Sequence, residues 1–289
     1  MTAPTAKIDR ATYFDALRND PFNGSLSQAQ VDGMNALLDV WEEHYANREG
    51  FVALELDYNM GTAFHETAFT MQPIHERGDP SYFLRYDVMG NAQKAAELGN
   101  TAPGDGFKFR GAGHVQNTGR RNARFSSDRL NEEFGLKIDF EANPDLRLDP
   151  ILSAHCLFLG NHEGWWTGVE LRAAIQTESW KDDRRVVNGT DKWQAIGNYA
   201  QAFRAARIAA QQEAAISQME AELLETEVQQ GAEAVTVRPA DTMLSKVARF
   251  TSDMRAMGFR VSVTITAVEQ PSITNNVTIK KPEAAASPT

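Results

Sequence analysis

The sequence of 289 residues contains a single cysteine, Cys156, and this scarcity excludes an intramolecular disulfide. The surrounding segment, SAHCLFLG, is apolar, so we expect a buried and unreactive thiol. His155, His162 and Glu163 lie nearby, but their spacing matches no zinc template, and we expect no metal and no cofactor. A chain without disulfides is typical of a reducing cytoplasm.

Long apolar runs are also missing: no stretch approaches the roughly 20 residues that cross a bilayer. The first residues, MTAPTAKIDRATYF, have neither the basic start nor the apolar core of a secretion signal. We therefore expect no membrane span and accumulation in the cytoplasm. A protein of this kind that acts outside the cytoplasm needs a partner to release it.

Positive charge is in short supply, with 29 Lys and Arg against 39 Asp and Glu and a formal net charge of −10. A general nucleic-acid binder is usually basic, so the composition argues against that class of partner. The hydrophobic content of 42% is ample for one domain of about 200 residues with an appendage.

Hydrophobic periodicity predicts a mainly α-helical body, which we assign to residues 1–212. Helices are expected over residues 8–17, 27–45, 51–66, 119–134, 151–160 and 169–176, with a long one starting at Trp193. Ser27 is the expected N-cap of the second. Residues 71–111 look irregular, and 181–189 are expected to form a charged turn.

The composition changes after Gln212, and residues 213–289 are expected to form a C-terminal α/β extension. Its first part, 213–233, is a Glu-, Gln- and Ala-rich helix that either packs weakly on the body or forms a short coiled coil. A second helix is predicted over 241–257 and a strand over 260–268, because RVSVTITAV alternates. From residue 270 a mobile tail is expected.

One acidic residue, Glu66, stands at the end of the apolar helix expected over 51–66, directly after His65. A buried acid without a function is costly, so perturbed acids in such places are candidate catalytic groups. Burial and the negative end of the helix dipole both disfavour a carboxylate's charged form. This position therefore suits a general acid.

Hydrolysis of a glycosidic bond needs a second carboxylate, which activates water or attacks the sugar. Glu76 follows ten residues later in IHERGD and is the favoured candidate. Asp79, Glu55 and Asp57 are rivals for the same role, and His75 is a possible base or an ordinary loop histidine.

A glycine-rich segment, GNTAPGDGFKFRGAGHVQNTGRRN, ends in an amide, a hydroxyl and two arginines: Gln116, Thr118, Arg120 and Arg121. Such groups can grip a sugar. The segment matches neither a phosphate loop nor a dinucleotide-binding fingerprint. The later GWWTG places Trp166 either in the core or as a platform on which a sugar stacks.

Taken in order, FHET, the glycine-rich segment, GWWTG and VVNG resemble glycoside hydrolase family 19 of the lysozyme-like superfamily, and most closely its bacterial and phage endolysin branch. The resemblance covers about residues 15–205. It implies a lysozyme-like helical domain that hydrolyses a β-1,4-linked glycan with two carboxylates.

The resemblance also implies residue roles. The expected catalytic group consists of Glu66 as general acid, Glu76 as second carboxylate and Thr118 as a hydroxyl that helps hold water; the expected sugar contacts are His65, Gln116, Arg120, Asn188 and Trp166. Three positions depart from the family pattern: Ala112 replaces Arg, Asn117 replaces Leu and Ala123 replaces an aromatic residue. We expect these departures to affect which substrate is preferred and to lower the activity if they weaken substrate binding.

Three functions remain open on this basis. The first is a phage or prophage peptidoglycan hydrolase of the endolysin type, released to the cell wall by a holin-type partner. The second is a chitinase, because chitin and peptidoglycan share N-acetylglucosamine and the linkage. The third is a virion-associated assembly protein that carries a hydrolase-like module, for which the extension after residue 212 is the motive.

Overall fold

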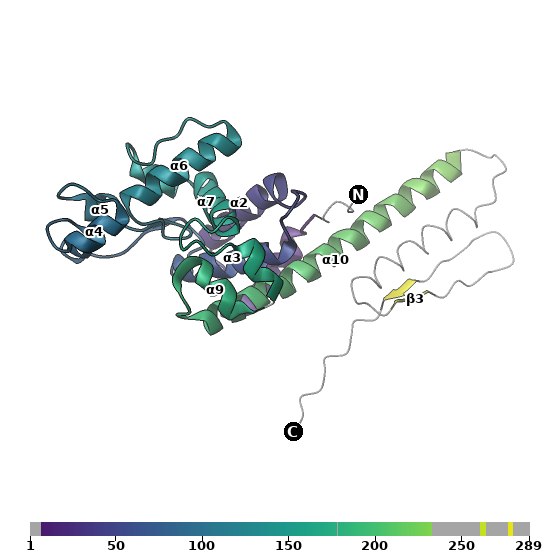
Figure 1. Ribbon diagram of the computed structural model, residues 1–289. Helices are drawn as coiled ribbons and strands as arrows, with labels where there is room; N and C mark the ends of the chain where they lie inside the picture. The colour runs from purple at the N-terminus through teal and green to yellow at the C-terminus, as the bar shows by residue number, and fades with distance from the viewer. Residues whose placement is uncertain (1–6, 178, 233–260, 264–276, 280–289) are drawn as a thin grey trace, which may run out of the picture. The chain divides into compact units, whose positions relative to one another are not determined.

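The computed structural model describes residues 7–177, 179–232, 261–263 and 277–279 (Figure 1). It is mainly α-helical, as the periodicity predicts. The chain divides into two compact units, Met1–Glu222 and Leu223–Thr289. Helix α10 (Trp193–Ala232) continues without a break past residue 212, where the composition changes.

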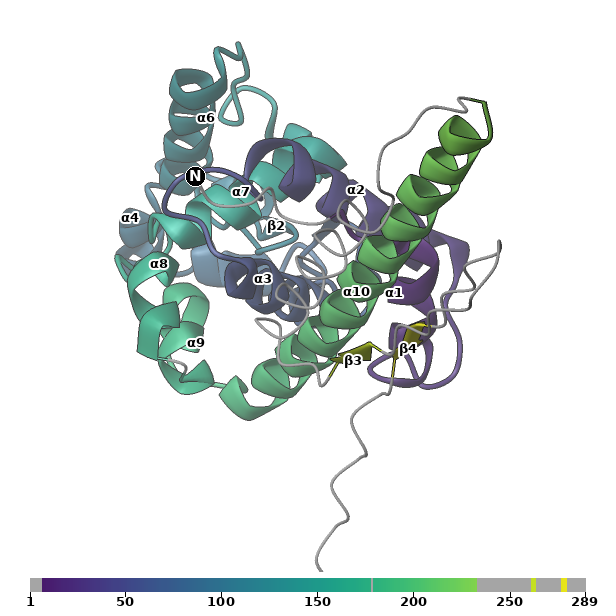
Figure 2. The same cartoon turned by 90° about the vertical axis from the view of Figure 1, so that its right-hand side faces the viewer.

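The first unit is built from short helices around two central helices, α3 (Ala53–Glu66) and α7 (Pro150–His162), as Figure 1 shows. Its elements before α10 are α1 (Arg10–Asn19), α2 (Gln28–His44), α3 (Ala53–Glu66), β1 (Ile74–His75), η1 (Tyr82–Tyr86), α4 (Ala92–Leu98), α5 (Asp105–Lys108), β2 (Ala112–Gly113), α6 (Arg120–Phe134), η2 (Pro144–Leu148), α7 (Pro150–His162), α8 (Leu171–Ala174), η3 (Ile175–Thr177) and α9 (Trp180–Asn188). Helix α7 packs against α2, α3 and α6. Figures 1 and 2 show α3 and α7 in the middle of this unit, with α4 and α5 at one end and α9 on another side.

Helices α2 and α3 form where the sequence predicts them. Ser27 caps α2 through a reciprocal pair of hydrogen bonds with Gln30, which satisfies donors that a helix start otherwise leaves free. Helix α3 buries ten of its 14 residues. Burial is nearly complete because α7 packs on one side and α10 approaches so closely that a methyl group on Gly61 would lie 2.7 Å from the Ala200 nitrogen.

The core is aromatic and aliphatic, and it contains the single cysteine. Trp41 of α2 contacts Phe158 of α7 at a ring-centroid distance of 5.3 Å, and both side chains are buried. Cys156 is 4% exposed, as predicted, and burial raises the pKa of its thiol to about 12. A thiol in this setting is not a nucleophile near neutral pH.

Two predictions about local structure are wrong. Of residues 181–189, expected as a turn, 181–188 belong to helix α9 (Trp180–Asn188). Asp182 and Asp183 fall in its first turn, where carboxylates favour the helix dipole, and Val186 anchors it in a small apolar cluster with Tyr58. The irregular stretch 71–111 also contains short elements, β1, η1, α4 and α5, which are too brief for periodicity to reveal.

Strands β1 and β2 bring the second candidate carboxylate to the glycine-rich segment. They pair antiparallel with Ile74 opposite Gly113 and His75 opposite Ala112. The pairing continues to the next residue, where the Glu76 nitrogen donates to the Gly111 carbonyl at 2.7 Å.

In the second unit the structure describes one antiparallel pair, β3 (Val261–Val263) and β4 (Val277–Ile279), with Ser262 opposite Thr278. Strand β3 agrees with the alternating pattern from residue 260. Strand β4 corrects the expectation of a wholly mobile tail after residue 270, because NNVTI also alternates. The helix predicted over 241–257 lies outside the described residues.

A buried histidine next to β2 makes stability depend on pH. The His114 ring contacts the Ser153 hydroxyl through Nδ1 at 2.8 Å and the Met71 carbonyl through Nε2 at 3.3 Å, and a neutral ring protonated at Nε2 satisfies both contacts. Burial lowers its pKa to about 4, whereas an unfolded histidine titrates near 6.5. The unfolded chain therefore binds more protons between these values, and stability falls as the pH decreases.

We expect this group to remove about 2.5 kcal/mol from the free energy of unfolding between pH 7 and pH 4.5. His155, whose pKa burial also lowers to about 4, contributes in the same direction. The measurement is urea unfolding at both pH values for the wild type and for His114→Gln. The variant should be less stable at pH 7 but show a smaller pH difference; equal differences would contradict the assignment.

Candidate active site

Glu66 is the last residue of α3, and its carboxylate is paired with an arginine from α9. Arg184 Nη1 donates to Glu66 Oε1 at 2.9 Å, and its Nε holds the Asp191 carbonyl at the same distance. The Arg184 side chain is 2% exposed and that of Glu66 is 17% exposed. Nothing in the sequence pattern indicated this buried arginine as the partner of Glu66. Oε2 of Glu66 has no hydrogen-bond partner among the described residues.

His65 precedes Glu66 and lies near the Tyr199 ring, with a centroid distance of 6.5 Å. Partial burial lowers the pKa of His65, although the neighbouring Glu66 carboxylate opposes this effect. Its Nδ1 is buried without a partner in the described part of the chain. At neutral pH His65 is therefore an uncharged ring beside the acid.

Glu76 is held by three donors on both of its oxygens. The hydroxyls of Tyr82 and Tyr86 donate to Oε1 at 3.2 and 3.0 Å, and the Gly111 nitrogen donates to Oε2 at 3.2 Å. Burial, followed by the Glu76 charge, raises the pKa of Tyr86 to about 12, so this phenol stays a donor. These three hydrogen bonds fix the orientation of the Glu76 carboxyl group beside Gly111.

Three side-chain oxygens converge over Gly111. A methyl group on this glycine would lie 2.7 Å from Gln116 Oε1 and 3.1 Å from both Glu76 Oε2 and Thr118 Oγ1. Glycine is therefore required here, because any side chain would occupy the place where the three acceptors meet. The glycine thus allows the three acceptor oxygens to lie close together around its α-carbon.

The structure fixes the orientation of the amide and the hydroxyl. Gln116 Nε2 donates to the carbonyls of Ile74 and Gly113 at 3.3 and 3.2 Å, which directs Oε1 to the space over Gly111. The Thr118 hydroxyl donates to the Gln116 carbonyl at 2.9 Å and keeps its lone pairs free to accept. Gln116 has a left-handed backbone with φ of +53°, a strained conformation of the kind that gathers at functional sites.

The rival carboxylates are occupied elsewhere. Glu55 is fully buried and contacts His162 Nδ1 at 2.8 Å. Asp57 is also buried and receives two hydrogen bonds of 2.7 Å from Arg207. Asp79 is exposed and accepts from Ser81 in a local turn. Glu76 is the carboxylate of this set that adjoins Gln116 and Thr118.

Arg120 and Trp166, two of the remaining predicted sugar contacts, have partners of their own, and Asn188 is exposed. Arg120 is engaged by Asp105 at 2.6 Å and Glu141 at 2.9 Å. Asn188 is exposed at the end of α9, and Gly189 follows it with φ of +47°. The Trp166 indole donates to Asn161 at 2.8 Å and packs on the core. Their sugar contacts stay predictions.

The three departures from the family pattern lie in the interior. Ala112 and Ala123 have no exposed surface. Asn117 is 2% exposed, and its amide nitrogen donates to the Ser126 hydroxyl at 2.8 Å. This bond to α6 satisfies the amide nitrogen, whereas the amide oxygen of Asn117 is buried without a partner among the described residues.

Sequence reasoning missed three residues that touch the carboxylates: Arg184, Tyr82 and Tyr86. Arg184 lies in the stretch expected as a turn, and both tyrosines lie in the stretch expected as irregular. Their bulk and hydrogen-bonding groups were visible in the sequence, but nothing in their spacing connects them with Glu66 or Glu76.

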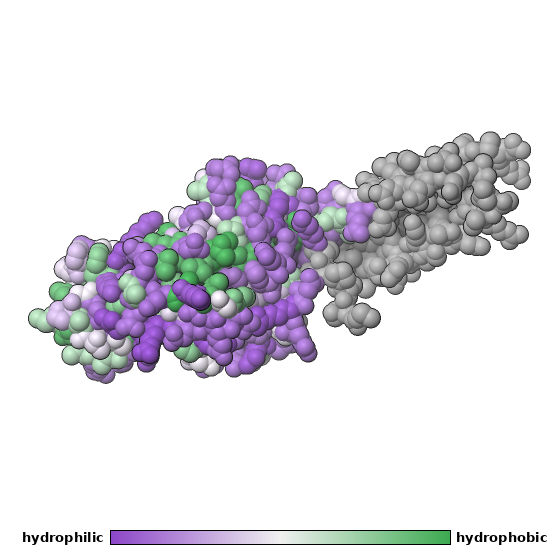
Figure 3. Space-filling model, turned by 90° about the horizontal axis from the view of Figure 1, so that it is seen from above, coloured by the Kyte–Doolittle hydropathy of each residue, from purple (hydrophilic) through white to green (hydrophobic). Residues whose placement is uncertain are grey.

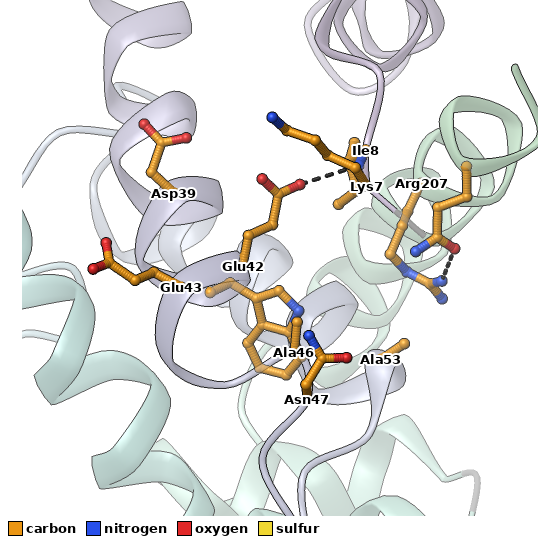
Figure 4. Close-up of a pocket in the computed structure, with 11 residues that line it drawn as sticks. Lys7, Ile8, Asp39, Glu42, Glu43, Ala46, Asn47, Ala53 and Arg207 are labelled. Atoms are coloured by element: carbon orange, nitrogen blue, oxygen red, sulfur yellow. Dashed lines mark hydrogen bonds between the residues drawn. The ribbon is translucent and has the colours of Figure 1, made fainter. Parts of the chain in front are cut away.

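A groove of about 410 Å³ lies between the N-terminal segment, α2 and α10, and none of the predicted site residues lines it (Figure 4). Figure 4 shows Asp39, Glu42 and Glu43 along α2 and Arg207 on the opposite helix. The Ile8 nitrogen donates a hydrogen bond to Glu42.

Within the residues that the structure describes, no three or more His, Cys, Asp and Glu residues form a group that could hold a metal ion. No described helix has both the length and the apolar character needed to cross a membrane.

Comparison with known proteins gives little to set beside this geometry. No family model and no curated protein matches the chain. Among solved structures, the chain is similar to a mutant of chitinase C with 14% identity and a TM-score of 0.49, over 71% of this chain and 95% of that chain. The function must therefore be argued from the residues themselves.

Proposed function

We propose that the protein hydrolyses β-1,4 glycosidic bonds in peptidoglycan with Glu66 as general acid and Glu76 as general base. The observation that carries the proposal is the meeting of Glu76 Oε2, Gln116 Oε1 and Thr118 Oγ1 over Gly111. A water molecule there can donate to two oxygens, one of them the carboxylate that takes its proton. The motifs resembling glycoside hydrolase family 19 supply the same residues independently.

The acid step requires a proton on Glu66. Arg184 contacts Oε1, so the proton belongs on Oε2, which is free to face the leaving oxygen of a bound glycan. A sugar that covers this carboxyl group excludes water from it. Glu66 then donates this proton as the bond between the anomeric carbon and the leaving oxygen breaks.

The water step follows an inverting course. Water over Gly111 gives a proton to Glu76 while its oxygen attacks the anomeric carbon from the face opposite the leaving group. Among the described residues, no hydrogen bond or ion pair joins Glu66 to Glu76, Gln116 or Thr118. We expect a carboxyl separation of roughly 6.5–9.5 Å, the range that leaves room for a water molecule.

The test is hydrolysis of purified murein and of chitin oligosaccharides, followed by reducing-end analysis of the products. We expect murein cleavage by the wild type and a loss of at least about 10²-fold in Glu66→Gln, which has nearly the same shape but cannot donate an acidic proton. Circular dichroism and melting confirm that the variant is folded. Undiminished cleavage by Glu66→Gln would reject the acid, and cleavage of chitin alone would identify a chitinase.

The endolysin role, with cytoplasmic accumulation and release by a holin-type partner, belongs to the same proposal. Its support is the likeness of the ordered motifs to the phage branch. The virion-associated alternative rests on the extension after residue 212 alone and is the weaker of the two.

A further inference from the structure

Two arginines near Glu76, the exposed Arg85 and the half-buried Arg110, are stacked on aromatic rings. The Arg85 guanidinium lies 3.9 Å from the centroid of the Tyr82 ring, and that of Arg110 lies 4.2 Å from the Phe107 ring. The rings are 37% and 41% exposed. Figure 3 shows hydrophobic and hydrophilic residues intermixed at the end of the first unit that carries α4 and α5.

The two stacks belong to one structure, which we term the ring ladder: Tyr82, Phe83 and Phe107. The buried Phe83 ring lies 5.0 Å from Tyr82 and 5.6 Å from Phe107, both edge to face. Both ends of the ladder lie beside residues that donate hydrogen bonds to Glu76, the proposed base. Tyr82 itself donates to Glu76 Oε1, and the residue after Arg110 donates its backbone nitrogen to Oε2.

Neither guanidinium forms an ion pair with a carboxylate in the described part of the chain. Arg110 Nη1 donates only to the Phe107 carbonyl, at 2.8 Å, which fixes the fork and leaves Nη2 and Nε available. By contrast, ion pairs with carboxylates are formed by Arg120, Arg184 and Arg207. In a chain of net charge −10, two unpaired and oriented arginines beside a catalytic carboxylate are a local cationic site.

We infer that Arg85 and Arg110 bind carboxylates carried by the substrate and thereby select peptidoglycan over chitin. This inference rests on the proposed function. Stacking covers one face of a guanidinium and leaves its N–H edge in the geometry that a carboxylate accepts. Peptidoglycan carries carboxylates on the peptide stems that are joined to its muramic acid, at repeating intervals along the glycan, whereas chitin is neutral. The rings provide apolar surface on which the glycan can lie beside Glu76.

The experiment measures binding on a Glu66→Gln background, so that no substrate is consumed. Insoluble murein sacculi and insoluble chitin are sedimented with this protein, with the added double change Arg85→Gln and Arg110→Gln, and with Arg124→Gln as control. Arg124 is an exposed arginine of α6 whose nearest carboxylate is 3.9 Å away. Melting of each variant confirms that it is folded.

We expect the double variant to bind murein about tenfold or more weakly at low ionic strength, because charge-assisted hydrogen bonds are lost. Chitin binding should change less than twofold, the control should match its parent, and salt should reduce the difference. Equal losses on both polymers, unchanged murein binding, or a parent that binds no murein would overturn the inference.

Failure of this inference and failure of the proposed function give different results. A wild-type protein that cleaves murein, together with a double variant that binds as its parent does, keeps the function and removes the arginine site. A protein that binds murein through the arginines but cleaves no glycan keeps the site and removes the hydrolase.

Discussion

Replacing Glu76 by alanine is expected to lower the turnover number for murein hydrolysis by about 10³-fold, within the range that loss of a general base usually produces. The physical reason is specific to this site. Glu76 Oε2 is the carboxyl oxygen among the three oxygens around Gly111, and the other two, on Gln116 and Thr118, cannot take a proton from water at neutral pH. Removing it leaves water oriented but not activated.

Azide provides a second measurement on the same variant. The anion is a nucleophile without needing a base, and the truncated side chain leaves room for it near Gly111. We expect azide to restore turnover in Glu76→Ala and to form a glycosyl azide of inverted anomeric configuration, with Glu66 still protonating the leaving oxygen.

The matched control is Asp79→Asn, which removes a carboxylate from the same loop. Asp79 is exposed and bonded to Ser81, so turnover should change less than twofold. Activity of Glu76→Ala within tenfold of the wild type would contradict the assignment, and a large loss in Asp79→Asn would transfer the role to that residue.

Much of the helical framework could be predicted because its signals are local. The residue types and spacing of Ser27 and Gln30 predict the start of α2. The continuous apolar run before Glu66 predicts α3. Helix α9 escaped prediction because its buried face is narrow. Asp183 and Arg184, which look like surface residues in the sequence, are 0% and 2% exposed.

The carboxylates could be proposed from the sequence but not told apart. What distinguishes Glu55 and Asp57 from a catalytic acid is their partners, which lie 107 and 150 residues further along the chain. The partner of Glu66 is 118 residues away. Only the folded chain shows that Glu55 and Asp57 are paired with other side chains in the core, while Glu76 adjoins Gln116 and Thr118.

The buried pair of Asp57 and Arg207 holds α10 against α3, the helix that ends in Glu66. We expect Arg207→Met to lower the free energy of unfolding by about 3–5 kcal/mol, because it leaves Asp57, 1% exposed, without its counter-charge. For a unit of this size the melting temperature should fall by about 10 °C. The measurements are thermal melting and urea unfolding of the full chain.

Two further variants separate pairing from packing. Arg129→Met breaks the ion pair between Arg129 and Glu163, whose side chains are 26% and 25% exposed. It should lower the free energy of unfolding by only about 1 kcal/mol, because water replaces the lost partner. Adding Asp57→Leu to Arg207→Met removes the stranded charge, so most of the lost stability should return. If Arg207→Met costs no more than Arg129→Met, or if the double variant is less stable than the single one, the pair does not hold α3 in the way that its geometry indicates.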